Sequence, residues 1–387
     1  MERIRLYIAA ALTGALAVAC GSKAPLTETT LSGLDPANFD ALYDGDTTAL
    51  YVLKNPAGME ACITNFGGRI VSLTVPDRNG TPRDVVLGFD SVQAYFPENN
   101  QTDFGAAIGR YANRINQGRF TLDGKEYQLP RNNFGHCLHG GTDMGTRGWQ
   151  YRTYSVAEHT DSTLTLTIDS PDGDNGFPGR VNATVKYTLT ADNALDIQYS
   201  ATTDAPTIIN MTNHAYFNLS GDPSKPITDQ LLTINAAEFT PVDSTFMTSG
   251  EIISVEGTPM DFRTGKLIGQ DIERVDYEQI RNANGYDHNW VLSTNRDIEV
   301  EAASLYSPAT GILMRVYTDE PGIQVYSGNF LDGTATGKHG VKYQQRTAIC
   351  LETQHYPDSP NKPHWPSTTL RPADTYASRT IYRFSTK

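Results

Sequence analysis

The chain has 387 residues, of which 39% are hydrophobic and 10% aromatic, so it can build a large core and its bulk is not intrinsically disordered. Its formal net charge is −13 and it has no basic stripe, which argues against nucleic acid and other polyanions as partners. The 33 glycines and 21 prolines predict many turns but fall short of a low-complexity composition.

The first 19 residues have the pattern of a signal peptide. Arg3 and Arg5 precede an uncharged apolar run over 6–19, which is too short to cross a membrane. Small residues at 17–19 directly precede Cys20, and this resembles the lipobox of bacterial lipoproteins, in which the cysteine is lipidated; Ala17 stands where Leu is commonest. We expect an exported protein that is lipid-anchored to a bacterial membrane, on the periplasmic or cell-surface side, and that touches the membrane only through the lipid. The alternative is an ordinary secretory signal cut nearby.

The segment that follows, residues 20–45, holds Ser, Lys, Pro, Thr and Gly with little periodicity, and we interpret it as a tether between anchor and domain. Three cysteines remain beyond it: Cys62, Cys137 and Cys350. They form no CxxC pair, which argues against a structural zinc site. Buried thiols are the favoured interpretation, and one disulfide of undetermined pairing is the alternative.

From residue 46 onward the chain is patterned as short strands and turns. Apolar and polar residues alternate in runs at 50–55, 60–65, 69–75 and 162–170. Two longer runs within 181–203 flank residues 191–193 and predict a hairpin. The best helical candidate, 266–281, is weak, and strands follow at 297–304 and 311–318. Many short strands without alternating helices predict one all-β domain over 46–387, an antiparallel β-sandwich.

Three strand-like runs carry polar side chains on one face, because residues two apart in a strand point the same way. The sets are Asn210, Thr212 and His214; Gln324 and Tyr326; and Glu352 and Gln354 with Cys350. Solvent exposure is the ordinary explanation for such faces. The residue types favour another one, since amides, imidazole, carboxylate and tyrosine with almost no lysine are typical of a cleft that binds sugar hydroxyls.

The motifs that contain these residues resemble the aldose 1-epimerase, or galactose mutarotase, family. They occur in the family's order and cover roughly residues 50–385. They are NRINQGRFTLDGKEYQL (113–129), LHGG (138–141) with Trp149, NMTNHAYFNL (210–219), GYDHNWVL (285–292), PGIQVYSGNFLDG (321–333) and CLETQHYPDSPNKP (350–363). The resemblance implies a large antiparallel β-sandwich, the galactose mutarotase-like supersandwich, with a sugar cleft on one face.

The resemblance also implies a reaction and its two catalytic residues. Interconversion of anomers needs one group to take the proton of the C1 hydroxyl and another to protonate the ring oxygen, with neither metal nor cofactor. By resemblance, Glu352 is the general base and His214 the general acid. Since a carboxylate beside an imidazole favours the charged form of each, we expect a His⁺/Glu⁻ pair at neutral pH.

Six further residues match the family's sugar-binding positions. Without the resemblance, each of these residues has an ordinary structural explanation. Arg114 could form a surface salt bridge, Asp287 could be a turn residue, and the glycines after His139 could mark only a turn. The resemblance implies contact with the monosaccharide for all six: Asn113, Arg114, His139, Tyr216, Asp287 and Gln324.

Other residues are expected to lie outside the chemistry or to depart from the family. His288 points away from Asp287 on an extended chain and is interpreted as structural. The remaining histidines are expected on the surface or in loops: His136, His159, His339, His355 and His364. Asp103 stands where the family usually has an aromatic residue, and 136–137 also depart from the common pattern, so both places could border the cleft.

The expected substrate is a free aldose such as galactose or glucose, and the preferred sugar and oligomeric state stay open. The alternative function is a non-catalytic sugar-binding lipoprotein on the same fold, although pure binding does not require the Glu352–His214 pair. An epimerase for sugar phosphates would need more basic residues. A glycosidase would need two carboxylates flanking the bond, and the motifs speak against that assignment.

Overall fold

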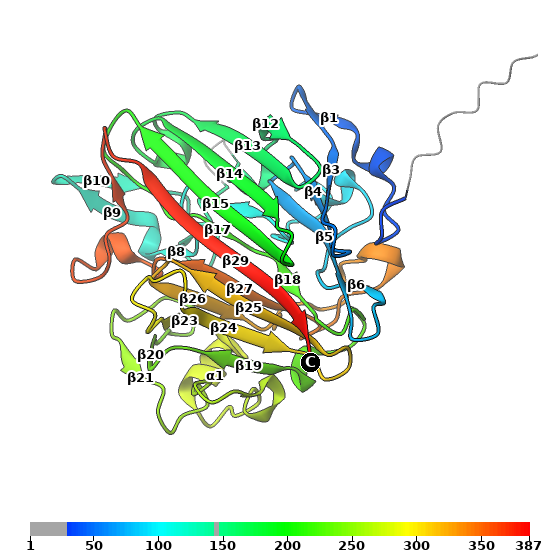
Figure 1. Cartoon of the computed structure of the whole chain (residues 1–387). Helices are drawn as coiled ribbons and strands as arrows, with labels where there is room; N and C mark the ends of the chain where they lie inside the picture. Colours follow the sequence, from blue (N-terminus) through cyan, green and yellow to red (C-terminus); the bar gives the residue numbers. More distant parts are fainter. Residues whose placement is uncertain (1–28, 143–146) are drawn as a thin grey trace, which may run out of the picture.

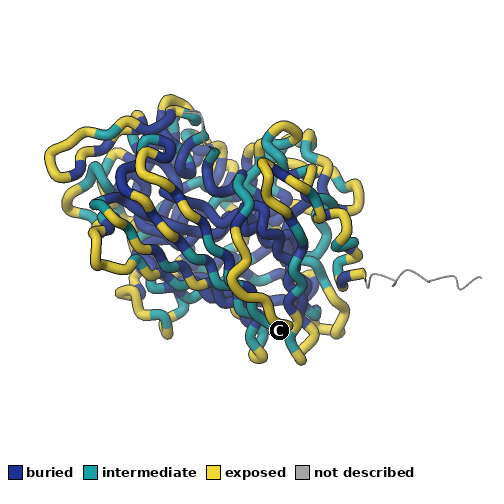
Figure 2. The backbone as a smooth tube through the Cα atoms, turned by 90° about the horizontal axis from the view of Figure 1, so that it is seen from above, coloured by how far each residue is buried: buried dark blue, intermediate teal, exposed yellow. Residues whose placement is uncertain are grey.

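A computed structural model of the chain describes residues 29–142 and 147–387. Its elements are almost all β-strands, and every paired strand in them is antiparallel to its neighbour (Figure 1). Within those residues α1 (Glu278–Ala283) is the only α-helix. Seen from above, buried chain fills the interior and exposed chain is concentrated in the loops (Figure 2).

The largest sheet has nine strands, and two of them, β13 (Thr163–Ser170) and β14 (Val181–Leu189), alternate buried and more exposed residues as a half-buried strand should. The predicted hairpin is confirmed: β14 and β15 pair along their whole length around a turn closed by the Thr190 N–H bond to the Ala194 carbonyl, 2.8 Å. The order across the sheet is β12 (Ser155–His159), β13 (Thr163–Ser170), β14 (Val181–Leu189), β15 (Ala194–Thr203), β29 (Tyr376–Thr386), β25 (Ile312–Thr318), β24 (Glu301–Tyr306), β19 (Leu231–Ile234) and β22 (Lys266–Leu267).

Two smaller sheets share the main core with it. The six-stranded sheet runs β18 (Tyr216–Phe217), β27 (Ile349–Gln354), β26 (Gly322–Tyr326), β23 (Asp287–Val291), β20 (Glu238–Thr240) and β21 (Ile253–Ser254), and the four-stranded sheet runs β3 (Leu50–Lys54), β4 (Glu60–Thr64), β5 (Arg69–Pro76) and β6 (Pro82–Asp84). Ile349 and Leu351 of β27 lie in that core, and the Tyr382 hydroxyl of β29 donates to the Leu351 carbonyl, 2.9 Å. The predicted β-sandwich is therefore confirmed.

Short elements complete the fold and hold the loops around the six-stranded sheet. The two-stranded pairs are β1 (Ala41–Tyr43) with β2 (Asp46–Thr48), β7 (Ala107–Ile108) with β17 (Thr212–Asn213), β8 (Arg114–Ile115) with β11 (Cys137–Leu138), β9 (Arg119–Leu122) with β10 (Lys125–Gln128), and β16 (Thr207–Ile208) with β28 (Thr369–Leu370). Single 3₁₀ turns are η1 (Pro36–Phe39), η2 (Val92–Tyr95), η3 (Asn116–Gly118), η4 (Trp149–Tyr151), η5 (Asp174–Gly176), η6 (Ile227–Asp229), η7 (Ile268–Gln270), η8 (Lys338–Gly340) and η9 (Ser359–Asn361).

The helix predicted over 266–281 is mostly absent. Its first part pairs with β19 as β22, a 3₁₀ turn follows, and α-helix forms only from Glu278. Lys266 donates to Asp271 at 2.6 Å and Ile272 packs into the core, so tertiary contacts hold a non-helical path. Weak helix propensity is easily overridden in this way.

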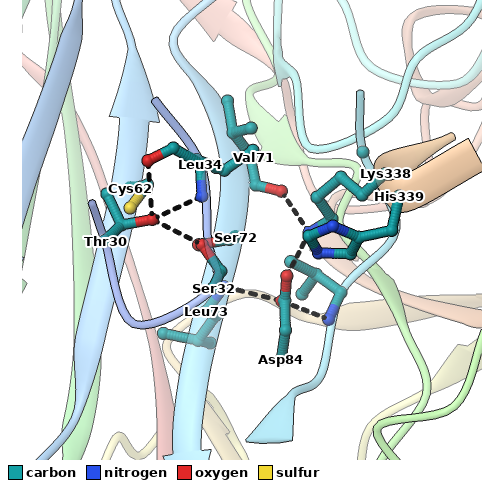
Figure 3. Close-up of polar contacts among 12 residues, drawn as sticks. Thr30, Ser32, Leu34, Cys62, Val71, Ser72, Leu73, Asp84, Lys338 and His339 are labelled. Carbon is teal, nitrogen blue, oxygen red and sulfur yellow. Dashed lines mark hydrogen bonds and ion pairs between the residues drawn. The ribbon is translucent and has the colours of Figure 1, made fainter. Parts of the chain in front are cut away.

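The segment predicted as a tether is partly folded. Leu34 and Phe39 are 1% and 0% exposed and pack with core residues of β4 and β5, because burying apolar side chains of this segment against that sheet removes them from water. The Leu31 N–H donates to a Glu60 carboxylate oxygen at 2.6 Å. The Ser72 hydroxyl donates to that of Ser32 at 2.9 Å (Figure 3). Residues of the segment 29–45, which was expected to be part of the tether, are therefore packed on the domain that was predicted to begin at residue 46.

The signal peptide over 1–19, Cys20 and the tether up to residue 28 lie outside the described residues. Among the residues that are described, no helix has the length and apolar character needed to cross a membrane. The thiols of Cys62 and Cys350 are buried and free, and Cys137 is buried as well, so the interpretation as buried cysteines is confirmed.

Candidate active site

Strand register gathers polar side chains on the face of the six-stranded sheet that turns away from the main core. Gln324 on β26 lies directly opposite Glu352 on β27, and Tyr326 lies opposite Cys350. On the two strands that flank this pair, Asp287 of β23 pairs with Tyr326, and Tyr216 of β18 pairs with Cys350. Directly opposed residues in an antiparallel pair point to the same face, so these positions form one continuous polar surface.

His214 reaches this surface from the short connection between β17 and β18. Its N–H donates to the Ala106 carbonyl at 2.9 Å, and its carbonyl accepts from the Gly105 N–H at 3.0 Å. The Thr212 hydroxyl donates to the Thr353 carbonyl, which ties the connection to β27. As a result, His214 Nε2 lies 3.6 Å from Glu352 Oε1, with side chains only 7% and 2% exposed.

His139 and Asn113 are held to each other. The His139 N–H donates to the Asn113 carbonyl at 3.1 Å, and the Asn113 N–H donates to His139 Nδ1 at 3.2 Å. The imidazole therefore carries any single proton on Nε2, which leaves it a hydrogen-bond donor. Gly140 follows because a Cβ there would come within 2.5 Å of the Gly109 carbonyl oxygen. Thus the glycine allows the close approach that sets His139 in place.

Arg114 is a buried cation, 7% exposed, at the edge of the same surface. Its guanidinium donates twice to Asn133 Oδ1, at 3.2 and 3.0 Å, and lies 4.9 Å from the Phe246 ring centroid. Burial lowers its pKa, while the charges of Asp287 and Glu352 act in the opposite direction. The interpretation of Arg114 as a surface salt-bridge residue is therefore excluded.

The other predicted binding residues surround the pair. Gln324 donates to Asp287 Oδ1 at 2.6 Å, and burial raises the pKa of Asp287. The Tyr216 ring stacks on the His214 imidazole with ring centroids 5.1 Å apart. His288 faces the opposite side of β23, between Phe239 and Trp290, as predicted.

All eight residues predicted for the site line one cavity of about 360 Å³. Eight more residues complete its walls: Gln101, Asp103, Asn133, Phe134, Leu138, Phe246, Tyr326 and Phe330. Asp103 and His139 also line a neighbouring cavity of about 520 Å³. Two of these additional residues had a signal in the sequence: Asp103 departs from the family's usual pattern, and Tyr326 belongs to a polar strand face. Asn133 and Phe246 lie between strands, where the sequence pattern gives no signal for a site.

The expected charged pair differs from what the structure favours. Burial raises the pKa of Glu352 well above its ordinary value, and the charges of Asp287 and Asp103 add to that effect. Burial lowers the pKa of His214. Both groups are thus driven toward their neutral forms, because removal from water disfavours the charged form of each. A pair that holds one proton in total can still place that proton on either partner.

Several buried polar atoms at the site have no hydrogen-bond partner among the described residues. They include Glu352 Oε2, His214 Nδ1 and Gln324 Oε1. Leaving such atoms unpaired costs free energy. Their convergence on one cavity indicates a surface built for a ligand rich in hydrogen-bonding groups.

Other polar residues singled out in the sequence have structural roles. Asn210 bonds to the His355 backbone, and His355 Nδ1 lies 2.6 Å from Glu320 Oε2. His136 and His355 lie in connections outside the named strands, within the expectation of a surface or loop position, but they are buried, at 7% and 6% exposed. His136 Nδ1 accepts from the Gln117 N–H, and its Nε2 contacts the Thr245 hydroxyl.

Two sets of side chains bring three potential metal-ligand atoms within 4.8 Å of one another: Asp103 with His139 and His214, and His214 with Cys350 and Glu352. Both sets contain His214, whose imidazole would be needed for proton transfer. The sequence predicts no metal and no cofactor, and by resemblance His214 is expected to be the general acid.

Fold and site together define a β-sandwich protein with a buried imidazole–carboxylate pair inside a cavity lined by hydrogen-bonding groups. A sequence profile of the family described as aldose 1-epimerase matches residues 49–383. Galactose mutarotase from Bos taurus is 41% identical over 324 residues, which cover 84% of this chain and 90% of that protein. Aldose 1-epimerase from Escherichia coli strain K12 is 38% identical over 343 residues, covering 88% and 96%.

Solved structures agree with the sequence relatives. The GalM/aldose epimerase homologue from C. elegans superposes with a TM-score of 0.79 at 33% identity, covering 88% of this chain and 99% of that one. The chain belongs to the aldose 1-epimerase family.

Proposed function

We propose that this protein is an aldose 1-epimerase that interconverts the α- and β-anomers of free aldoses. The observation that carries the proposal is the Glu352–His214 pair, 3.6 Å apart and almost fully buried in a cavity with unpaired polar atoms. Relatives named galactose mutarotase and aldose 1-epimerase, at 38–41% identity over most of the chain, support the same activity.

The reaction conserves the proton count of the pair. With the shared proton on His214, Glu352 takes the proton of the C1 hydroxyl while the C1–O5 bond breaks and the aldehyde forms. His214 gives its proton to the departing ring oxygen. Rotation about C1–C2 presents the other face of the aldehyde, and ring closure reverses both transfers. Each positioned acid or base contributes roughly 10²- to 10⁴-fold in rate.

The remaining residues bind and orient the sugar. Arg114 and the Nε2–H of His139 are donors, and Asp287 is an acceptor; Gln324 supplies an unpaired amide oxygen. Asn113 acts through the bonds that hold His139 and Arg114 in place. The Tyr216 ring, stacked on His214, limits the motion of the imidazole. Galactose and glucose are the first substrates to test, since hydroxyls of either fit this mixture of donors and acceptors.

Polarimetry tests the activity directly. Freshly dissolved α-D-galactose and α-D-glucose should reach their equilibrium optical rotation faster with the protein, in proportion to its concentration, than in a buffer blank. Binding of either sugar, seen by calorimetry, without acceleration would overturn the proposal in favour of a non-catalytic sugar-binding protein on the same fold.

We further propose that the protein is exported and lipid-anchored through Cys20. The support is in the sequence alone: two arginines, a short apolar run and small residues immediately before the cysteine. A labelled fatty acid supplied to expressing cells should be incorporated into the protein. Incorporation into a protein that retains residues 1–19 would contradict the cleavage site.

A further inference from the structure

Asp103 is a third carboxylate of the site, and its place is fixed by the chain around His214. It precedes a turn in which the Ala106 N–H donates to the Asp103 carbonyl at 3.0 Å. The same turn bonds to His214 in both directions, through the Gly105 N–H and the Ala106 carbonyl. Any movement of Asp103 relative to the imidazole is therefore restrained by backbone hydrogen bonds.

The Asp103 carboxylate is close to both imidazoles. One of its oxygens, one nitrogen of His139 and one nitrogen of His214 lie within 4.8 Å of one another. Asp103 Oδ1 is buried and has no hydrogen-bond partner in the described part of the chain. A buried carboxylate oxygen without a partner is costly unless a cation or a donor comes to it during function.

The charged and titratable groups around His214 come from several elements. Glu352 and Cys350 lie on β27, Tyr216 on β18 and Tyr326 on β26, while His139 follows β11. Arg69 on β5 acts against a positive charge on His214, and Asp103 acts in favour of one. Asp103 also opposes ionisation of Glu352.

On the basis of the proposed function, we propose that Asp103 is a positioning residue of the reaction. Its carboxylate holds the proton-bearing imidazolium of His214, ready to protonate the ring oxygen, and its charge makes Glu352 a stronger base toward the C1 hydroxyl. The single negative charge of Asp103 thus favours the protonated form of His214, as a general acid requires, and makes Glu352 a stronger base.

The first test follows the protonation of His214 itself and does not depend on turnover. Histidine labelled with ¹³C at Cε1 is introduced into the full-length protein, and the His214 signal is assigned by its loss in His214→Asn. In Asp103→Asn the midpoint of the His214 titration should fall by about one pH unit or more, as expected when a carboxylate within ~4–6 Å loses its charge. Asp103→Glu, which keeps the charge, should titrate close to the parent protein.

The second test uses the pH profile of kcat on an aldose that the parent protein turns over. Both limbs should move to lower pH in Asp103→Asn, because the pKa values of Glu352 and His214 fall together. A purely structural role would lower the rate without moving either limb. If Asp103→Asn does not fold, Asp103→Ser makes the same comparison.

An unchanged His214 midpoint in the folded neutral variant overturns the inference, whatever the activity. An inactive parent protein with a shifted midpoint would instead refute the proposed function and leave the Asp103–His214 coupling established.

Discussion

Replacing Glu352 by Gln removes the proposed general base and leaves its surroundings almost unchanged. The amide keeps nearly the same volume in a side-chain site that is only 2% exposed, and it keeps an oxygen facing His214 Nε2 at the 3.6 Å contact. What is lost is proton acceptance, which is worth roughly 10²- to 10⁴-fold in rate. At about 1.4 kcal/mol per factor of ten, the barrier rises by ~3–5 kcal/mol. Polarimetry should show that loss in kcat, with KM changed by less than about threefold.

The same substitution should stabilise the protein at neutral pH. Burial raises the pKa of Glu352, so above the ordinary pKa of a glutamate the folded chain retains a proton that the unfolded chain has lost. Stability is therefore greatest below the unfolded pKa and falls as pH rises through the window up to the folded pKa. Because the Gln side chain does not titrate, the variant does not lose stability at this position over this pH range. The melting temperature of Glu352→Gln relative to the parent should increase between pH 4 and pH 8.

Glu60→Gln is the matched control. Glu60 on β4 is also fully buried with a pKa raised by burial, but it lies outside the cavity and bonds to the Leu31 N–H. It should show the same trend of stability with pH, reduced by its contact with Lys54, and an unchanged kcat. A Glu352→Gln variant that turns over sugar at the parent rate would refute the assignment of the base, and a pH-independent difference in melting temperature would refute the desolvation argument.

Three further substitutions test separate parts of the description. Arg114→Lys removes the two hydrogen bonds from the guanidinium to Asn133 and should raise KM by about tenfold or more, because a hydrogen bond to a charged group is worth ~1.5–3 kcal/mol. An unchanged KM in polarimetry would mean that the guanidinium does not orient the sugar. Burial lowers the pKa of His288 to about 3. As pH drops from about 6.5 toward 3, the unfolded chain therefore binds a proton at this position before the folded chain does, and the free energy of unfolding falls by up to ~1.4 kcal/mol per pH unit. His288→Asn should lose that part of the slope in urea unfolding between pH 4 and pH 7, and parallel slopes would contradict it. Cys20→Ala should move the protein from the membrane fraction to the soluble fraction on centrifugation, and retention in the membrane would sink the lipid-anchor proposal.

Strand alternation allowed much of the site to be predicted before the structure. A period of two places Gln324 and Tyr326 on one face of β26, and Glu352 on the matching face of β27, so the motifs and the pleat together locate the polar surface. His214 depends on a non-repetitive connection, and only its motif identified it. The glycine pair after His139 was equally consistent with an ordinary turn until the close approach to Gly109 was visible.

What could not be predicted depends on contacts between distant parts of the chain. The segment 29–45 has no periodicity, and its packing rests on Leu34 and Phe39 meeting the four-stranded sheet. The charge state of the Glu352–His214 pair follows from burial, which a sequence does not give. Asn133 and Phe246 border the cavity from turns, where residue type alone says little about contact with a ligand.

The position of β29 has a consequence for how the molecule is made. This last strand, Tyr376–Thr386, lies in the middle of the nine-stranded sheet and pairs with β15 on one side and β25 on the other. Until residue 386 has been synthesised, the two halves of the sheet each present an open edge, and such edges invite association between chains. Because the closing partners are far apart in sequence, closure is slow compared with local hairpin formation. Deleting even the final dozen residues should therefore yield aggregation during biogenesis instead of a slightly shortened protein.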